Sequence, residues 1–298
     1  MMLKKGAAEC VKYIKLLFLT LIFLFSFAAA PGNEARAAGG QIPYSFFLEH
    51  PYSITGVRGN LEIVSVDGGG ALIMNQLRAD VNLSENLFGV YAKFPFAGVT
   101  NGVFGNGDYD FGNIGLGTKY ALLNMNNSVL TLGFELLLPT TGNNNGTLGA
   151  RSYFRDFAYF TDDAYTLVPY GVFAITGDIF AFQANLDFDI MTNAEDADES
   201  PFDTGGDGTE LIIKYGATGS ITPHFNLPFS TSFLLELLLA SSTSFDKNVT
   251  GAYVTPGVRF GGQVFSVGAG VQVPFGSDEI NDFGNVDFLV DMIVRFGS

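Results

Sequence analysis

The chain has 298 residues, of which 47% are hydrophobic and only 15% are charged, and its formal net charge is −15. A soluble protein of this length carries about 25% charged residues, and a mean hydropathy of +0.27 also departs from a soluble composition. The acidic balance argues against nucleic acid as a partner, because nucleic acids are themselves strongly negative.

The membrane class follows from the length of the apolar runs. After residue 30 no run reaches the roughly 18 residues that a spanning helix requires, and the longest, 233–240, is interrupted by Glu236. A chain that is apolar on average but lacks such a run has one common membrane solution, a closed barrel. The 37 glycines and 30 phenylalanines fit it. We therefore expect an all-β fold, a transmembrane antiparallel up-and-down β-barrel.

Residues 1–38 are expected to form a signal peptide. An apolar stretch, 16–30, is followed by Ala35-Arg36-Ala37, which resembles a cleavage site, and an alternative cut follows Ala30. An uncleaved anchor helix is the competing interpretation. Cleavage would remove Cys10, the only cysteine, and would change the net charge from −15 to −18 by deleting five positive and two negative charges. The basic residues before the apolar stretch are Lys4, Lys5, Lys12 and Lys15.

Residues 39–57 precede the first expected strand and are rich in proline and aromatic residues. Two interpretations stay open, an ordered periplasmic N-terminal lead or a partial plug of the lumen, and the lead is favoured. The residues behind both are Pro43, Tyr44, Phe46, Phe47, Pro51 and Tyr52.

Residues 58–298 are expected to form the barrel, because segments of about ten residues alternate apolar and polar between turn residues. In 180–190 one face carries phenylalanine, leucine and isoleucine, and the other carries glutamine, asparagine and aspartate. Twelve strands are expected, since single-chain bacterial barrels have an even number. They are 58–66, 70–82, 86–96, 111–124, 128–139, 164–176, 179–191, 209–220, 229–241, 251–260, 263–274 and 286–296.

The even strand number leaves 150–160 outside the wall. We expect it within a long loop, 140–163, on the same side as the loops 97–110, 192–208 and 275–285, with tight turns on the other side. It is interpreted as a packed loop, a short helix or strand extension; an inward constriction is the alternative. Two loops are acidic, at 195–207 and 278–282. Their spacing matches no calcium loop, so solvated loops are expected.

The stretch 110–142, DFGNIGLGTKYALLNMNNSVLTLGFELLLPTTG, has a glycine-rich strand ending in Lys-Tyr, a tight turn and an apolar strand ending in Pro-Thr. With Leu234-Leu235-Glu236, 256–260 and 271–274, it resembles the outer-membrane transporter family of the meta-pathway of phenol degradation. The resemblance covers roughly residues 56–296. It implies a channel for aromatic or other hydrophobic compounds and fixes no binding residues. The last strand, ending in Phe296, is also similar to the C-terminal signal for barrel assembly, although Gly297 and Ser298 follow.

Alternation assigns the inward face. Inward glycines, at 115, 117, 133, 268 and 270, are expected to leave space and so to favour a passage. Glu62, Arg78, Asp80, Asp189 and Ser232 share the inward faces. The candidates for the lumen lining are Tyr91, Lys93, Lys119, Glu135, Gln183, Asp187, Glu210, Lys214, Glu236, Arg259, Asp291 and Arg295.

Catalytic and cofactor motifs are weak. The two histidines, His50 and His224, are not placed beside a serine on one strand face, so a Ser-His-Asp hydrolase is not expected. Gly112, Gly115 and Gly117 precede no helix, which argues against a nucleotide loop. No cofactor and no metal site is expected, because sites built on histidine or cysteine need more of them.

The resulting hypothesis is a non-enzymatic channel in the outer membrane of a Gram-negative bacterium, for passive uptake of small hydrophobic or aromatic solutes. Its expected partners are outer-membrane lipid, lipopolysaccharide, the barrel-assembly machinery and a small-molecule solute, with no nucleic acid. The alternative is a structural or adhesive barrel that acts through its acidic outer loops.

Overall fold

The computed structural model describes residues 42–66, 70–84, 87–100, 109–142, 144–151, 153–192, 209–224, 229–243, 249–262, 264–276 and 286–296. The predicted signal peptide lies outside the described residues, and so do the two acidic loop segments, 193–208 and 277–285. No helix in the described part of the chain is long and apolar enough to cross a membrane.

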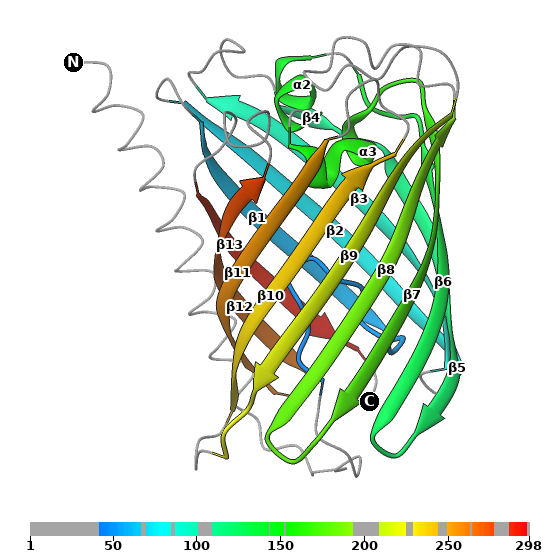
Figure 1. Ribbon diagram of the computed structural model, residues 1–298, viewed down its shortest axis with the longest axis vertical. Helices are drawn as coiled ribbons and strands as arrows, with labels where there is room; N and C mark the ends of the chain where they lie inside the picture. The colour runs from blue at the N-terminus through cyan, green and yellow to red at the C-terminus, as the bar shows by residue number, and fades with distance from the viewer. Residues whose placement is uncertain are drawn as a thin grey trace, which may run out of the picture. The chain divides into compact units, whose positions relative to one another are not determined.

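Twelve of the thirteen strands in the described residues close into an antiparallel barrel (Figure 1). Strands adjacent in sequence pair with each other, and β1 with β13 closes the ring. The short β4 (Tyr109–Phe111) instead pairs with one end of β3. The predicted twelve-stranded barrel is confirmed. Its strands are β1 (Gly56–Val66), β2 (Gly70–Ser84), β3 (Phe88–Thr100), β5 (Ile114–Met125), β6 (Ser128–Leu138), β7 (Tyr165–Thr176), β8 (Phe180–Thr192), β9 (Thr209–Ile221), β10 (Ser230–Ser242), β11 (Thr250–Gly261), β12 (Phe265–Gly276) and β13 (Asp287–Arg295).

Side chains alternate between the outer surface and the interior along each strand, as the pleat of a β-strand requires. In β10, Phe233, Leu235, Leu237 and Leu239 are each about half exposed, whereas Glu236 between them is fully buried. The barrel therefore has an apolar outer surface of the kind that faces lipid. The longest apolar run after residue 30 therefore belongs to one strand, which has apolar residues on both faces and a single inward carboxylate.

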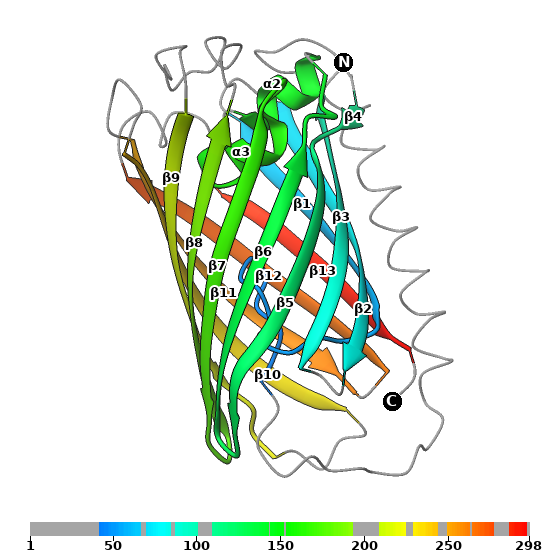
Figure 2. The ribbon, with the colours of Figure 1, turned by 90° about the vertical axis from the view of Figure 1, so that its right-hand side faces the viewer.

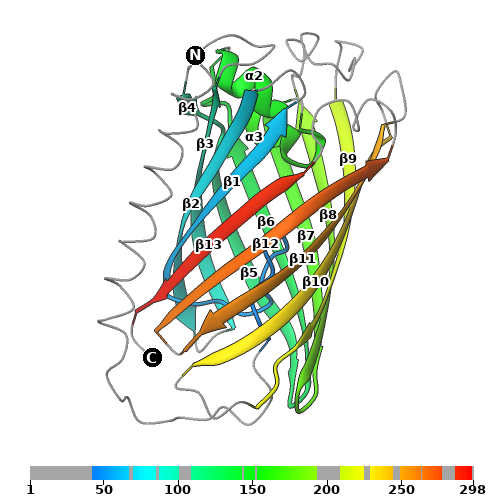
Figure 3. The same cartoon turned by 90° about the vertical axis from the view of Figure 1, so that its left-hand side faces the viewer.

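The two ends of the barrel differ. Tight hairpins join β5 to β6 and β7 to β8 at one end, and helices α2 and α3 with β4 lie at the other (Figures 1 and 2). Residues 42–55 lead into β1 at the hairpin end. Their trace runs inside the ring of strands, as the views in Figures 1 and 3 agree. We call residues 42–55 the plug because their trace lies inside the ring of strands.

The connection between β6 and β7 folds into the opposite mouth. It contains α2 (Asn145–Arg151), the 3₁₀ helix η1 (Phe154–Asp156) and α3 (Phe157–Phe160), which together we call the cap. The prediction that 150–160 is not a wall strand is confirmed. The segment is both packed and inward, since Phe154 and Phe157 are buried in one cluster with Leu137, Met191 and Ile212 of the inner wall.

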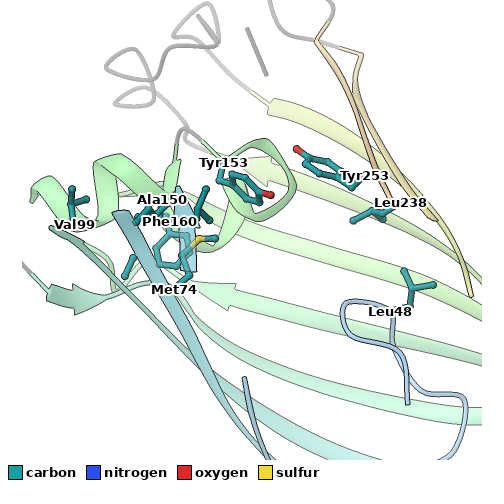
Figure 4. Packing of buried hydrophobic residues seen from close by; sticks show 11 residues of the cluster. Leu48, Met74, Val99, Ala150, Tyr153, Phe160, Leu238 and Tyr253 are labelled. Carbon is teal, nitrogen blue, oxygen red and sulfur yellow. The ribbon is translucent and has the colours of Figure 1, made fainter. Parts of the chain in front are cut away.

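A second apolar cluster connects plug, wall and cap, as Figure 4 shows. Leu48 comes from the plug, Met74 and Val99 from β2 and β3, and Ala150 and Phe160 from the cap. Each of these side chains is at least 96% buried. Part of the hydrophobic core thus lies in the lumen, where it fixes the cap against the wall.

Candidate functional site: the occluded lumen

The lumen is charged, and its charges come from the inward faces that alternation predicts. All twelve predicted lining residues lie on the interior. Ten of them are buried, whereas Asp187 and Arg295 are half-buried. Charge belongs inside because Arg or Lys on the lipid face costs about 2–4 kcal/mol at the membrane midplane.

The plug places a carboxylate, Glu49, among the cations of β2 and β3. Glu49 lies 2.6 Å from Arg78 and 2.7 Å from the Nζ atom of Lys93. Arg78 also binds Asp80 at 2.8 Å, and Lys93 also binds Glu135 at 2.7 Å. Although burial opposes ionisation, the charges of Arg78, Lys93 and the nearby Lys119 hold the pKa of Glu49 well below its usual range. The plug is therefore bound to this wall as an anion.

A second carboxylate, Glu236 of β10, binds the backbone of the plug. Its two oxygens accept hydrogen bonds from the N–H groups of Phe46 and Phe47, at 2.8 and 3.0 Å. Arg58 of β1 donates to the carbonyl oxygens of Ser45 and Phe46, both at 2.6 Å. These hydrogen bonds satisfy backbone N–H and C=O groups that would otherwise pair with a neighbouring strand. They therefore allow irregular backbone to be held inside the barrel.

Other predicted lining residues bind plug carbonyls. Lys119 donates to the oxygen of His50 at 3.0 Å, Gln183 to that of Glu49 at 2.8 Å, and Arg259 to that of Tyr44 at 2.8 Å. Five predicted lining residues, namely Lys93, Lys119, Gln183, Glu236 and Arg259, thus bind the plug directly.

The plug also carries a buried histidine. His50 stacks on Tyr44 with ring centroids 3.8 Å apart, and its ring nitrogens lie 3.2–3.3 Å from the carbonyl oxygens of Ile42 and Tyr52. Burial, reinforced by the charge of Lys119, lowers the pKa of His50 to about 3. The docked plug consequently holds a neutral imidazole at ordinary pH.

The cap is anchored by Arg155. Its guanidinium binds Glu62 of β1 and Gln272 of β12, and its Nε lies 2.9 Å from Asp156. The same group stacks over the ring of Phe47 at 3.7 Å, so Arg155 joins the cap to the plug.

Tyr159 of the cap binds the wall. Its hydroxyl donates to Glu135 at 3.1 Å and lies 2.9 Å from the Nζ of Lys93. Burial and the adjacent carboxylate raise the pKa of Tyr159 well above its usual range, so the hydroxyl keeps its proton. Lys93 thereby contacts wall, plug and cap through three different groups.

Between plug and cap lies a chamber of about 110 Å³. Its lining is mixed. Phe46, Phe47 and Leu48 of the plug and Phe160 of the cap present apolar surface, and charged side chains come from β1–β3, β6, β8 and β9. In this chamber both kinds of surface border free volume.

The inward glycines do not open a passage; that expectation is wrong for this conformation. A Cβ atom on Gly117 would lie 2.1 Å from the ring of Tyr91, and one on Gly133 would lie 2.1 Å from the ring of Tyr170. The space that these glycines leave is filled by tyrosine rings from the neighbouring strand.

The glycines of β12 serve the plug. Cβ atoms on Gly268 and Gly270 would lie 2.9 and 3.2 Å from the ring of Phe46, and Gly257 of β11 faces the same ring. Gly115 of β5 similarly makes room for the carboxylate of Glu135. At these positions an inward glycine leaves room for a bulky side-chain group of another residue.

Comparison with known proteins identifies a fold. The sequence matches no protein-family model, and no curated protein is significantly similar to it. The COG4313 outer membrane channel from Pseudomonas putida F1 is similar, with a TM-score of 0.55 and 12% identity over 86% of this chain and 100% of that chain. For the NanC porin the TM-score is 0.48, with 10% identity over 81% of this chain and 99% of that chain. The chain has the fold of an outer-membrane β-barrel.

The resemblance of the sequence to the phenol meta-pathway family is not confirmed by these comparisons. The similarity of this chain to the Pseudomonas channel extends over the length of that protein, which supports the barrel architecture. At 12% identity the similarity concerns the fold, so function has to be argued from the lumen.

The described part of the barrel contains no group of three or more His, Cys, Asp or Glu side chains placed to hold a metal ion. His224 is exposed and lies 3.3 Å from Asp178, in a turn region. His50 contacts backbone carbonyls and a tyrosine ring. Neither histidine is hydrogen-bonded to a serine within the described residues.

Sequence reasoning missed four residues of the lumen. Three of them lie in segments that do not follow the alternation of a β-strand. Glu49 belongs to the plug, and Arg155 and Tyr159 belong to the cap. Arg58 stands at the start of β1, where its inward direction was not recognised. A signal was present in Gly257 and Gly270, which face each other on adjacent strands and leave a hollow for an aromatic ring.

Proposed function

We propose that the chain is an outer-membrane channel for passive uptake of small solutes and that the plug is its gate. One observation carries the proposal: two segments that are not wall strands pack inside the lumen, and a chamber remains between them. Withdrawal of the plug would connect this chamber with the hairpin end without breaking any strand pairing.

The contacts of the plug suit reversible movement. Many are hydrogen bonds and ion pairs between polar groups, which water can replace, and each contributes about 0.5–1.5 kcal/mol net, or about 1.5–3 kcal/mol where a charge takes part. Phe46 and Leu48 add buried apolar contacts. The cations that hold Glu49 keep a second partner each, since Arg78 binds Asp80 and Lys93 binds Glu135. Release of the plug therefore leaves neither cation unpaired.

The solutes that we propose are small and partly hydrophobic or aromatic. Phe46, Phe47, Tyr159 and Phe160 supply aromatic surface around the chamber. An engineered cavity of about 150 Å³ holds benzene, so a chamber of about 110 Å³ accepts only a smaller molecule until the plug moves. The gate would thus act as a size filter.

The proposed location is the outer membrane of a Gram-negative bacterium, with lipid and lipopolysaccharide around the wall and the barrel-assembly machinery as a transient partner. The apolar outer surface supports this. We propose no enzymatic activity. The structural or adhesive alternative depends on the acidic loops, which lie outside the described residues.

The test is single-channel conductance of the purified barrel in planar bilayers, compared with a variant that lacks residues 42–55. We expect brief, infrequent steps for the intact chain and frequent ohmic steps for the variant. Folding of both is checked by the heat-dependent mobility shift of barrels on gels. If both are folded and both are silent, the channel proposal fails and the structural alternative is favoured.

A further inference from the structure

The cations that line the chamber already have anionic partners. Five cations line it, and each lies within 3.0 Å of a carboxylate oxygen. An anionic solute would have to compete with a carboxylate that is already in place at every one of them. These cations are Arg58, Arg78, Lys93, Arg155 and Lys214.

Asp187 of β8 is the exception among the carboxylates that line the chamber. It forms no ion pair within the described residues, and its Oδ1 atom is buried without a hydrogen-bond partner. Its neighbour on β9, Lys214, is directly opposite in the strand register, yet Lys214 pairs with Asp189 at 2.5 Å. The chamber therefore holds one carboxylate with unused capacity to accept hydrogen bonds.

Asp187 is half-buried as a residue, but its Oδ1 atom is buried. A buried carboxylate oxygen without a partner is unfavourable, because the interior does not replace the solvation that the anion loses. A solute that carries an ammonium group would donate the missing hydrogen bond to Asp187. The unfavourable desolvation of Asp187 would then be relieved on binding, which increases the affinity. Such charge-assisted hydrogen bonds are about twice as strong as neutral ones. A neutral N–H donor gains a weaker contact, because it lacks the attraction between opposite charges, and an anionic solute gains none.

We propose that the chamber selects small organic cations, in which an ammonium group is attached to a compact apolar body, and that Asp187 receives the ammonium group. The apolar surfaces of Leu48, Phe47 and Phe160 would contact the body of the solute. This substrate class rests on the proposed channel function, since it describes what the channel would select.

The probes are a matched set with one isopropyl body: isopropylammonium, isobutyrate and isobutyramide, each small enough for a chamber of about 110 Å³. Binding is measured by ligand-observed NMR titration of the full chain, purified from a Gram-negative host and folded in detergent. We expect saturable binding of isopropylammonium and no comparable binding of the anion or the amide.

Two variants with opposite expected effects separate recognition from damage. Asp187→Asn keeps the shape of the side chain and removes the charge, so binding of isopropylammonium should weaken about tenfold. Lys214→Gln frees Asp189 to join Asp187, so binding of the cation should become tighter. A structural defect would weaken binding in both variants. Asp187→Glu should restore most of the affinity.

The inference is overturned if the three probes bind equally, if Asp187→Asn leaves cation binding unchanged, or if Lys214→Gln weakens it as much as Asp187→Asn does. Conductance of the same preparations distinguishes this failure from failure of the channel. A conducting barrel without cation preference contradicts only the assignment of Asp187. A silent barrel that binds isopropylammonium through Asp187 contradicts only the transport step.

Discussion

The plug and the cap both close the lumen, but they are held by different forces. The cap is joined to wall strands at both ends and buries Phe154 and Phe157 against the inner wall. The plug leads into the wall only at β1 within the described residues. It is held by Glu49, Glu236 and bonds to its carbonyl oxygens, and it buries fewer large apolar side chains, chiefly Phe46 and Leu48. Apolar packing is lost when such surfaces separate in water, whereas hydrogen bonds are exchanged for others. We infer that the cap is a fixed constriction and the plug a movable gate.

The largest expected effect is on the cap. Phe157→Ala removes a fully buried ring and should destabilise the packing of the cap by about 3–5 kcal/mol. Thermal unfolding of the detergent-folded variant should show a lower transition temperature than that of the unchanged chain. Phe180→Ala is the matched control, because that ring is 54% exposed on the outer surface and its loss should leave the transition almost unchanged. Equal effects would contradict the assignment of the cap to the core.

A smaller effect is expected for the plug. Glu49→Gln removes the charge that Arg78 and Lys93 bind, but each cation keeps another carboxylate. Docking should weaken by about 1.5–3 kcal/mol, and the open probability in bilayer recordings should rise at least about tenfold, since about 1.4 kcal/mol corresponds to that factor. Unchanged thermal stability together with a higher open probability would sharpen the contrast with Phe157→Ala. An unchanged open probability would contradict the role of Glu49.

Acid should release the plug through His50. Its docked pKa, about 3, lies below the value near 6.5 of a free imidazole, so the docked plug binds fewer protons than the released one. Docking is thus fully favoured above about pH 6.5 and weakens as the pH falls toward 3, by about 1.4 kcal/mol per unit. At pH 5.5 the open probability should be about tenfold higher than at pH 7.5. His50→Gln should abolish this dependence; if it persists, another group is responsible.

The smallest expected effect comes from single side-chain hydrogen bonds. It should differ between a bond to the plug and a bond within the wall. Thr131 donates to the carbonyl oxygen of Pro51 at 2.7 Å, and Thr118 donates to that of Gly89 in β3 at 3.2 Å. Thr131→Val should weaken docking by about 1 kcal/mol and raise the open probability several-fold. Thr118→Val removes a similar bond but should leave gating unchanged. Equal gating in the two variants would mean that this bond contributes nothing to closure.

Local periodicity predicts the wall and cannot predict what fills it. A two-residue repeat assigns Glu236 and Lys119 to the interior, since each residue's side is fixed by its neighbours in the strand. The partners of these residues are distant in sequence: the N–H of Phe46 binds Glu236 across 190 positions, and Lys119 binds the carbonyl oxygen of His50 across 69. Such contacts depend on the closed barrel and leave no periodic trace in residues 42–55. Strand parity places the cap outside the wall, but its inward fold depends on the packing of Phe157 with Met191 and Ile212.

The central claim is that the plug moves when the channel opens, and a reversible cross-link tests it most directly. Ser45 of the plug and Thr218 of β9 have hydroxyl oxygens 2.8 Å apart, and the only cysteine of the chain, Cys10, lies in the predicted signal peptide. In the double variant Ser45→Cys with Thr218→Cys, oxidation should suppress conductance steps in planar bilayers, and a thiol reductant should restore them. If the disulfide forms and the steps continue unchanged, the plug is not the gate.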